Sequence, residues 1–150
     1  MAGNWMRLEI DGRVENLGLC RLAVAAFASG LGFTIPELDE IKVMVSEAVS
    51  NAIVHGYRDR GGSVRLEAHA LSDGIEILVA DDGCGIENVA QAREPAYSTD
   101  PERMGLGFVF MESFSDSLEV ESELQVGTTV RLTKRHEPAG GGGDAPAGTA

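Results

Sequence analysis

A glutamate and an asparagine lie one helical turn apart near the middle of the chain, at Glu47 and Asn51. A glutamate that faces apolar neighbours loses hydration, and this raises its pKa toward the range of a general base. The amide oxygen of an asparagine is a neutral ligand that Mg²⁺ accepts beside several waters. The pair therefore sets a proton acceptor next to a metal ligand. A lone Glu-x-x-x-Asn pattern is more often an ordinary helix surface, so other motifs must decide whether this pair belongs to a functional site.

Two glycine-containing segments further along favour the interpretation of this pair as a proton acceptor and a metal ligand. Asp81 directly follows an apolar strand sequence, where its carboxylate can accept a hydrogen bond from an adenine amino group. Gly83 and Gly85 then allow the backbone to pass a base or ribose without a Cβ clash. Gly105 and Gly107 open a predicted helix, whose free N–H groups suit phosphate. Taken singly, these segments could equally be a common turn and a hinge, and neither is a Walker A loop or a Rossmann fingerprint.

The segment between these glycine regions is expected to be a mobile loop that serves as a lid. Residues 90–103 contain Pro95 and Pro101 and show poor periodicity. Arg103 comes just before Gly105, where its guanidinium could reach a terminal phosphate as the lid closes. A solvated arginine with a surface glutamate partner is the alternative.

The elements that position these residues follow from hydrophobic periodicity. Helices are predicted over 15–29, from Ile35 to about Val54, and over 104–114. In the first helix, the recurring apolar residues are Leu19, Leu22, Ala23, Ala26 and Phe27. Alternating patterns predict strands at 5–10, 63–70, 75–80, 118–122 and 128–133.

This order of elements predicts the fold class. The strands are mostly linked as hairpins, so an antiparallel or mixed sheet with helices covering one face is the natural solution. We expect one α+β domain over residues 1–136, a two-layer sandwich with a mixed, mostly antiparallel sheet. Residues 137–150 are rich in Gly, Ala and Pro and lack periodicity, so we expect a disordered tail.

Composition narrows the class of function. The chain has 150 residues, of which 43% are hydrophobic and 24% charged, and its formal net charge is -12. This charge argues against direct binding to nucleic acid, which needs clustered Lys and Arg. No apolar stretch approaches the length of a bilayer span and no charged-then-apolar leader opens the chain, so a cytoplasmic location is expected. Cys20 and Cys84 lack the spacing of a zinc site.

With these residues in place, the chain resembles the GHKL ATPase/kinase superfamily, which includes gyrase, histidine kinases and MutL. Glu47 and Asn51 match its N box. The later boxes match, in order, Asp81-x-Gly83-x-Gly85, Gly105-x-Gly107 and Gly127-Thr128. The resemblance implies a Bergerat-type fold and binding of ATP with Mg²⁺. In this family pattern, a threonine such as Thr128 supports the adenine-binding aspartate.

Within that superfamily, residues 46–57 look most like the N box of the anti-sigma-factor serine kinases of Gram-positive bacteria, especially those that act on a sporulation sigma factor of the sigma-F type. The resemblance implies a homodimer that binds the sigma factor, blocks transcription and phosphorylates a serine of an anti-anti-sigma factor. It implies no contact with membrane. The implied catalytic residues are Glu47 and Arg103, Asn51 is the implied Mg²⁺ ligand, and Arg21 is an implied partner contact. The implied ATP-binding residues are Asn51, Asp81, Gly83, Gly85, Gly105, Gly107 and Thr128.

Three other interpretations stay open at this point. The chain could be a nucleotide-gated sigma-binding module without turnover, or a stress-response anti-sigma kinase of the sigma-B type. The catalytic half of a histidine kinase is disfavoured, because we find no room for a dimerisation helix pair with a phosphoacceptor histidine.

The chain departs from the family pattern at two places. The segment before Gly105 looks shorter than in the family, and Leu17 replaces a polar residue on the expected partner surface.

Overall fold

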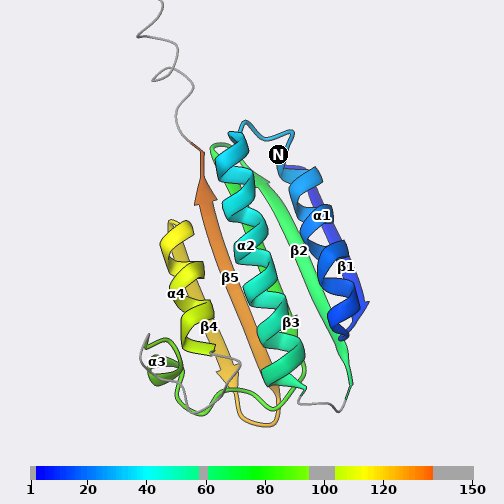
Figure 1. The fold of residues 1–150 in the computed structure, drawn as a ribbon, viewed down its shortest axis with the longest axis vertical. Coiled ribbons are helices and arrows are strands. Elements are labelled where there is room, and N and C mark those ends of the chain that lie inside the picture. Colours follow the sequence, from blue (N-terminus) through cyan, green and yellow to red (C-terminus); the bar gives the residue numbers. More distant parts are fainter. Residues whose placement is uncertain (1–2, 58–60, 95–103, 137–150) are drawn as a thin grey trace, which may run out of the picture.

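The fold is a two-layer sandwich, in which helices cover one face of a sheet (Figure 1). A computed structural model describes residues 3–57, 61–94 and 104–136. The five-stranded sheet has the order β1-β2-β3-β5-β4, and all four pairings are antiparallel. The strands are β1 (Trp5–Asp11), β2 (Ser63–Leu71), β3 (Gly74–Asp81), β4 (Ser117–Glu123) and β5 (Gly127–Arg135). The predicted α+β class is confirmed, and the sheet is antiparallel throughout the described residues.

Helix α2 (Ile35–Asn51) begins at a capping box, as its sequence suggests. The Thr34 side chain accepts a hydrogen bond from the Glu37 N–H, the Glu37 side chain accepts one from the Thr34 N–H, and Pro36 occupies the first turn. Its buried residues recur at helical spacing and pack over the sheet: Ile41, Met44, Val45, Ala48 and Val49. The helix continues as a π-helical turn, η2 (Ala52–Gly56), that ends beside the loops after β3.

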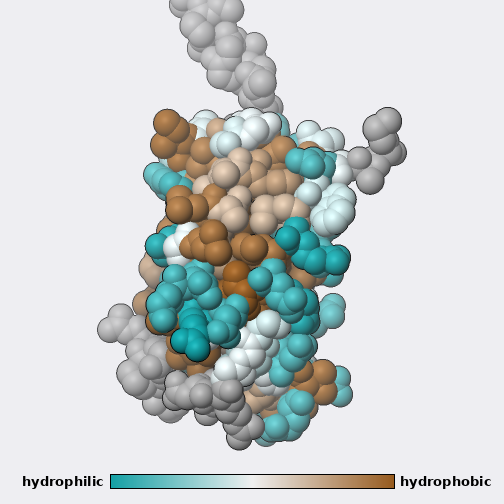
Figure 2. All heavy atoms as spheres, turned by 90° about the vertical axis from the view of Figure 1, so that its right-hand side faces the viewer, coloured by the Kyte–Doolittle hydropathy of each residue, from teal (hydrophilic) through white to brown (hydrophobic). Residues whose placement is uncertain are grey.

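Helix α1 (Leu17–Ala28) forms where predicted, after a short 3₁₀ turn η1 (Val14–Asn16), but the buried face differs from the predicted one. Cys20, Val24 and Ala28 are fully buried, whereas Leu19 is 52% and Leu22 67% exposed. The helix is apolar on most sides, so periodicity alone could not select its inner face. Contact with α2 and β2 selects it instead. The side of the molecule that carries α1 and β1 shows apolar residues at its surface (Figure 2).

Helix α4 (Met104–Phe114) packs against α2 and completes the helical layer. Phe108 and Met111 point into the core and are almost completely buried. The far end of α4 is held by Lys134 of β5, whose Nζ donates to the Phe114 carbonyl at 2.7 Å and to Glu40 Oε1 at 2.9 Å. The predicted helix over 104–114 is therefore confirmed.

The predicted loop over 90–103 begins in a short helix instead. Helix α3 (Val89–Ala92) is capped by Asn88, whose side chain accepts a hydrogen bond from the Gln91 N–H. This local cap, which the sequence reading overlooked, stabilises the turn. Residues 95–103 and the tail 137–150 lie outside the described residues, so the lid and the tail stay predictions. No helix within the described part of the chain is long and apolar enough to cross a membrane.

Candidate functional site

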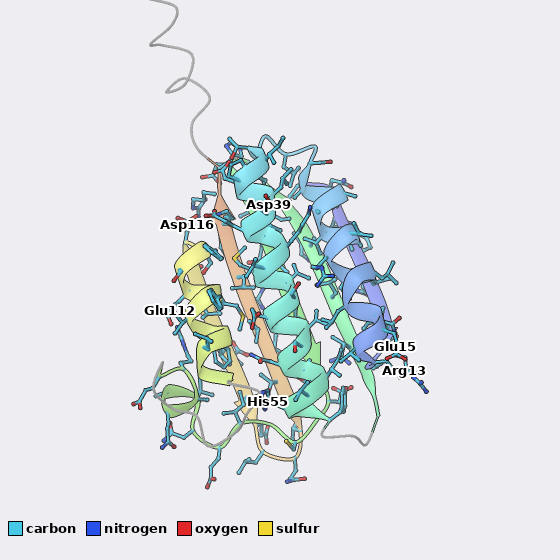
Figure 3. All side chains as sticks on the ribbon, in the orientation of Figure 1. Arg13, Glu15, Asp39, His55, Glu112 and Asp116 are labelled. Carbon is cyan, nitrogen blue, oxygen red and sulfur yellow. The ribbon has the colours of Figure 1, made fainter. Side chains whose placement is uncertain are left out.

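A pocket opens where the end of α2 and η2 meets the ends of β3 and β5. Its polar lining includes Asn51, His55, Asp81 and Thr128. Its apolar walls are formed by Ala48, Val79, Ile86, Phe108 and Val130. His55 lies at the end of the long helical segment, at the same end of the molecule as the loops after β3 (Figure 3). An apolar slot with a few polar groups at its walls is typical of a small-molecule site.

The N-terminal turn of α4 meets the end of α2 at Glu47 and Asn51. A Cβ atom on Gly107 would lie 2.9 Å from Glu47 Oε1 and 3.6 Å from both side-chain atoms Nδ2 and Oδ1 of Asn51. A side chain at this position would therefore displace the Glu47 carboxylate. The structure brings Gly107 next to Glu47 and Asn51, which lie more than 50 residues earlier in the chain.

Glu47 has the electrostatic character that its sequence position suggests. Its side chain is partly buried, and burial raises its pKa above the ordinary value of 4.5. Desolvation disfavours the ionised form and makes the carboxylate a better proton acceptor once it is ionised. The predicted direction of this shift is confirmed.

Asn51 is suited to bind a ligand in the pocket. Among the described residues, its buried Nδ2 has no hydrogen-bond partner. Buried polar atoms are rarely left unpaired, so an acceptor on a bound molecule fits here. The amide oxygen is a hard ligand of the kind that Mg²⁺ uses. No group of three His, Cys, Asp or Glu side chains suited to a metal occurs in the described ranges. A magnesium ion held mainly by phosphate and water would suit this donor set.

Asp81 is the buried carboxylate of the pocket. It ends β3, is only 6% exposed, and its Oδ1 accepts a hydrogen bond of 2.8 Å from the Gly83 N–H. Burial raises its pKa, while hydrogen bonds from the backbone of Gly83 and Thr128 partly oppose the rise. A Cβ on Gly56 would lie 2.8 Å from Asp81 Oδ1, so Gly56 makes room for this carboxylate. The sequence analysis did not identify Gly56, which is the last residue of η2.

Thr128 lies opposite Asp81 in the register between β3 and β5. It is 8% exposed, and its Oγ1 is 2.8 Å from the Ser122 Oγ of β4. Ser122 Oγ also accepts a hydrogen bond of 2.7 Å from the Ile86 N–H. Ser122, which the sequence reading did not identify, thus ties the loop after β3 to the start of β5.

The glycines of the first glycine loop are required by the protein backbone itself. A Cβ on Gly83 would lie within 2.1 Å of the Gly56 carbonyl oxygen. Gly85 has a φ of +77°, and a Cβ there would meet the Glu123 carbonyl. The sequence argument expected these glycines to make room for a base or ribose, whereas the structure shows them making room for neighbouring backbone. Cys84 between them is held by its N–H to the Gly56 carbonyl at 2.8 Å.

The remaining predicted residues lie apart from the pocket or outside the described residues. Arg103 belongs to the undescribed segment 95–103. Gly105 lies in the first turn of α4, beside Gly107. Arg21 is exposed on α1, and its Nη1 donates to the Ser46 Oγ of α2 at 3.3 Å, so it does not line the pocket.

Comparison with known sequences identifies a protein family and related proteins. A family profile described as "Histidine kinase-like ATPase domain" matches residues 10–134. The chain is 50% identical over 135 residues to a Clostridium perfringens protein named anti-sigma F factor, covering 88% of this chain and 96% of that protein. It is 47% identical over 134 residues to the anti-sigma F factor of Geobacillus thermodenitrificans, covering 87% of this chain and 92% of that one.

Solved structures share the fold. A crystal structure of RsbU and RsbW domains from Mycobacterium tuberculosis matches with a TM-score of 0.65 and 21% identity, over 91% of this chain and 34% of that one. The histidine kinase domain of the Erythrobacter litoralis blue-light activated histidine kinase matches with a TM-score of 0.54 and 22% identity, over 81% of this chain and 59% of that one. These likenesses show that the arrangement of helices and strands is shared with kinase-like ATPase domains.

Proposed function

This chain belongs to the family of histidine kinase-like ATPase domains and, within it, to the anti-sigma F factors, and we propose that it is an anti-sigma factor and an ATP-dependent serine protein kinase. It binds a sporulation sigma factor of the sigma-F type, so that transcription is blocked, and it phosphorylates a serine of an anti-anti-sigma factor. One observation carries the proposal of a kinase: Glu47, Asn51 and Gly107 meet beside the pocket that holds the buried Asp81.

Glu47 is the proposed general base. ATP with Mg²⁺, when bound, would supply an activated phosphoryl group. Glu47 accepts the proton of the attacking serine hydroxyl, and its raised pKa suits this role. Asn51 orients the metal through its amide oxygen. Arg103 is proposed to stabilise charge on the transferred phosphoryl group.

The other pocket residues bind the nucleotide in this proposal. Asp81 accepts a hydrogen bond from the adenine amino group, and Thr128 supports it from β5. Burial of Asp81 makes this contact selective, because a purine without a donor at that position would lose this hydrogen bond to a carboxylate that is shielded from water. The loop that contains Gly83 and Gly85 would contact the base and ribose. Gly105 and Gly107, at the first turn of α4, offer N–H groups to the phosphates.

The surface around α1 is the proposed partner side. Leu19 and Leu22 are exposed there, close to Arg21, and β1 is an edge strand of the sheet (Figure 1). Exposed apolar residues beside a free strand edge are typical of protein interfaces. We assign the homodimer contact to this side, with Arg21 touching the sigma factor. A Leu22→Asp variant should then have half the wild-type molar mass in sedimentation, and an unchanged mass would contradict the assignment.

The net charge of -12 supports partners that are proteins with basic patches and offers nothing for direct binding of nucleic acid. No membrane contact is proposed, and the cytoplasmic location stays a prediction.

The deciding experiment is a transfer assay with γ-labelled ATP, Mg²⁺ and the cognate anti-anti-sigma protein. The wild-type chain should label that protein on serine, and a partner with the target serine changed to alanine should stay unlabelled. Glu47→Ala should keep ATP binding and lose transfer by about 10²-fold or more. Glu119→Ala, which alters an exposed carboxylate of β4, serves as the matched control.

That assay, together with a pull-down of sigma factors in the presence of ATP, separates the alternatives. ATP-dependent capture of the sigma factor without any label would indicate a nucleotide-gated binding module. Preference for a stress-response sigma factor of the sigma-B type over the sigma-F type would shift the assignment within the family. Transfer at the wild-type rate in Glu47→Ala would exclude Glu47 as the base.

A further inference from the structure

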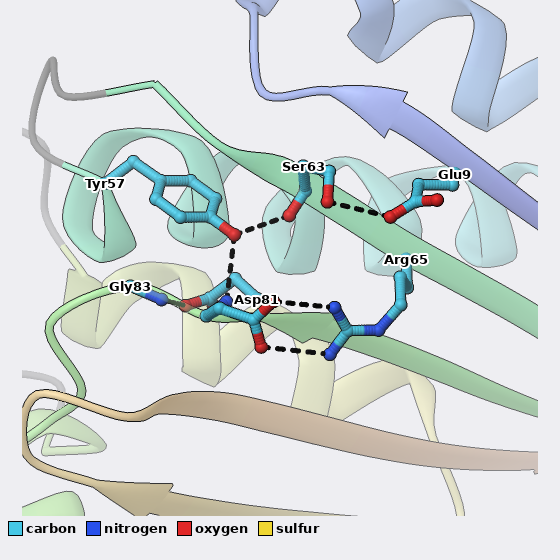
Figure 4. A network of polar contacts seen from close by, with 7 residues as sticks. Glu9, Tyr57, Ser63, Arg65, Asp81 and Gly83 are labelled. Atoms are coloured by element: carbon cyan, nitrogen blue, oxygen red, sulfur yellow. Dashed lines mark hydrogen bonds and ion pairs between the residues drawn. The ribbon is translucent and has the colours of Figure 1, made fainter.

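Tyr57, the residue that follows η2, joins the end of the helical segment to the loop after β3 (Figure 4). Its side chain is buried, with 7% of its surface exposed. Its hydroxyl contacts two backbone groups, the Asp82 N–H at 2.8 Å and the Ser63 carbonyl at the start of β2. Asp82 directly follows Asp81, the buried carboxylate of the pocket.

The direction of both hydrogen bonds is fixed by chemistry. A backbone N–H can only donate, so the Tyr57 oxygen accepts from Asp82. The hydroxyl proton then points to the Ser63 carbonyl, which can only accept. The phenol hydroxyl can accept from the Asp82 N–H and donate to the Ser63 carbonyl at the same time. Phenylalanine would fill the same space and serve neither.

The ring has little freedom to move. A Cβ on Gly62 would lie 2.2 Å from Tyr57 Cε1, and a Cβ on Gly12 would lie 3.3 Å from Tyr57 Cδ2. Ring and backbone are therefore in direct contact on these sides. Because the ring is fixed, the hydroxyl is a rigid anchor for the Asp82 backbone.

Other contacts hold the same loop, but at different points. The Arg65 guanidinium binds the Asp82 carboxylate at 2.9 and 3.2 Å, and both side chains are substantially exposed, at 37% and 64%. Exposed ion pairs contribute little to position or stability. The Cys84 N–H is bound to the Gly56 carbonyl on the far side of the turn. The Asp81 carboxylate also accepts a hydrogen bond from the Gly83 N–H, and the Tyr57 hydroxyl binds the backbone of Asp82, the residue between these two.

We propose that Tyr57 is a positioning residue of the nucleotide site: its hydroxyl fixes the backbone of Asp82 and thereby the direction of the Asp81 carboxylate. The inference rests on the proposed function, since it assumes that Asp81 reads the adenine amino group. It predicts that Tyr57 governs nucleotide affinity and base selectivity, and leaves the phosphoryl-transfer step to Glu47 and its neighbours.

The protonation state of Tyr57 supports this role. Burial raises the pKa of its hydroxyl above the ordinary value of 10.0, with the hydrogen bond from Asp82 acting in the opposite direction. The hydroxyl therefore keeps its proton, and both hydrogen bonds, across the pH range in which the protein is assayed.

The test compares ATP and GTP binding by the wild-type chain and by Tyr57→Phe, with Mg²⁺ present. Tyr57→Phe keeps the ring between Gly12 and Gly62 and removes the hydroxyl alone. We expect its Kd for ATP to rise about five- to tenfold. Its Kd for GTP should change by less than about twofold, because guanine lacks the amino group that Asp81 binds. The kcat should stay within about twofold while KM rises.

Arg65→Gln is the matched control, because it removes the exposed contact to the Asp82 side chain and leaves the buried one. Its ATP affinity should equal that of the wild type. A role of Tyr57 in stability alone would lower the folded fraction and change neither KM nor the ATP-to-GTP ratio. An unchanged ATP Kd in folded Tyr57→Phe, or equal losses for both nucleotides, would overturn the inference.

Asp81→Asn separates this inference from the proposed function. If the wild type binds ATP and Asp81→Asn does not, while Tyr57→Phe binds normally, only the inference fails. If the wild-type chain binds no ATP, the proposed function fails. Should Tyr57→Phe not fold, hydrogen exchange of the wild-type Asp82 amide decides instead. We expect that amide to be strongly protected without nucleotide, and exchange at the rate of an unstructured peptide would overturn the inference.

Discussion

Replacing Asp81 by asparagine should weaken ATP binding without weakening the fold. The Asp81 carboxylate is buried, and burial raises its pKa above the ordinary value of 3.8. An acid whose pKa is higher in the folded state opposes folding once it is ionised. This loss of stability develops as the pH rises from the ordinary value through the folded pKa. Asparagine removes it, and its Oδ1 can still accept from the Gly83 N–H.

The size of the binding effect follows from the contact that is lost. A hydrogen bond to a charged acceptor contributes about 1.5–3 kcal/mol, so the Kd for ATP should rise about 13- to 160-fold. At an ATP concentration of about 100 times the wild-type Kd, the wild-type fold gains about 2.7 kcal/mol from the ligand. The Asp81→Asn fold should gain only about 0.3–1.3 kcal/mol at the same concentration.

Thermal unfolding with and without ATP and Mg²⁺ measures both effects in one assay. For a chain of this size, about 1 kcal/mol moves the Tm by 2–4 °C. The wild-type Tm should therefore rise by about 5–11 °C on adding ATP, and that of Asp81→Asn by about 1–5 °C. Without nucleotide, the Tm of Asp81→Asn at pH 7 should equal or exceed the wild-type value.

Asp82→Asn is the natural control, because its carboxylate is exposed and paired with Arg65. That pairing lowers the pKa of Asp82, so its ionised form favours folding, and the substitution should reduce stability slightly. Its Tm shift with ATP should match the wild type. A full ATP shift in Asp81→Asn, or a nucleotide-free Tm several degrees below the wild type, would refute the assignment of Asp81.

Three further outcomes follow from the structure. The rate of phosphoryl transfer should fall as the pH drops, with a midpoint above the ordinary glutamate pKa of 4.5. The reason is that burial raises the pKa of Glu47, and only its ionised form accepts a proton. A pH–rate profile that follows an unshifted carboxylate would contradict this. Gly107→Ala should reduce transfer about 10-fold or more, since its methyl would lie 2.9 Å from Glu47 Oε1, whereas Gly30→Ala, with no atom within 4 Å, should leave the rate unchanged. Lys134→Met should lower the free energy of unfolding by about 1–3 kcal/mol in denaturant, because the buried ammonium binds Glu40 and the end of α4. A stability equal to that of the wild type would show that these contacts contribute nothing.

The sequence was a good guide to which elements form. The helical periodicity from Ile35 and the alternation at 63–70 and 128–133 are local signals, and the corresponding elements appear where expected. The short helix α3 was missed because its signal is a single capping asparagine, Asn88, in a stretch that otherwise reads as loop. The capping hydrogen bonds at Thr34 and Asn88 are local, so a short window of sequence contains the information on where these two helices begin.

The inner face of α1 could not be predicted in the same way. Leu19 and Leu22 are as apolar as the residues that are buried, yet they lie on the surface. A helix that is apolar on most sides has no single amphipathic stripe, and the packing of its neighbours decides which side is covered. The exposed side is the one now proposed for partner contact.

For the candidate site, the amino-acid sequence determined the chemical groups and their order: a glutamate and an asparagine one turn apart, a strand that ends in an aspartate, and glycines where helices and turns begin. The tertiary structure decided which of these groups meet. It placed Gly107 against Glu47, Gly56 against Asp81 and the Tyr57 hydroxyl on the Asp82 backbone. Contacts between residues far apart in the chain depend on how whole helices and strands pack, and that packing is a property of the complete fold, which no local pattern contains.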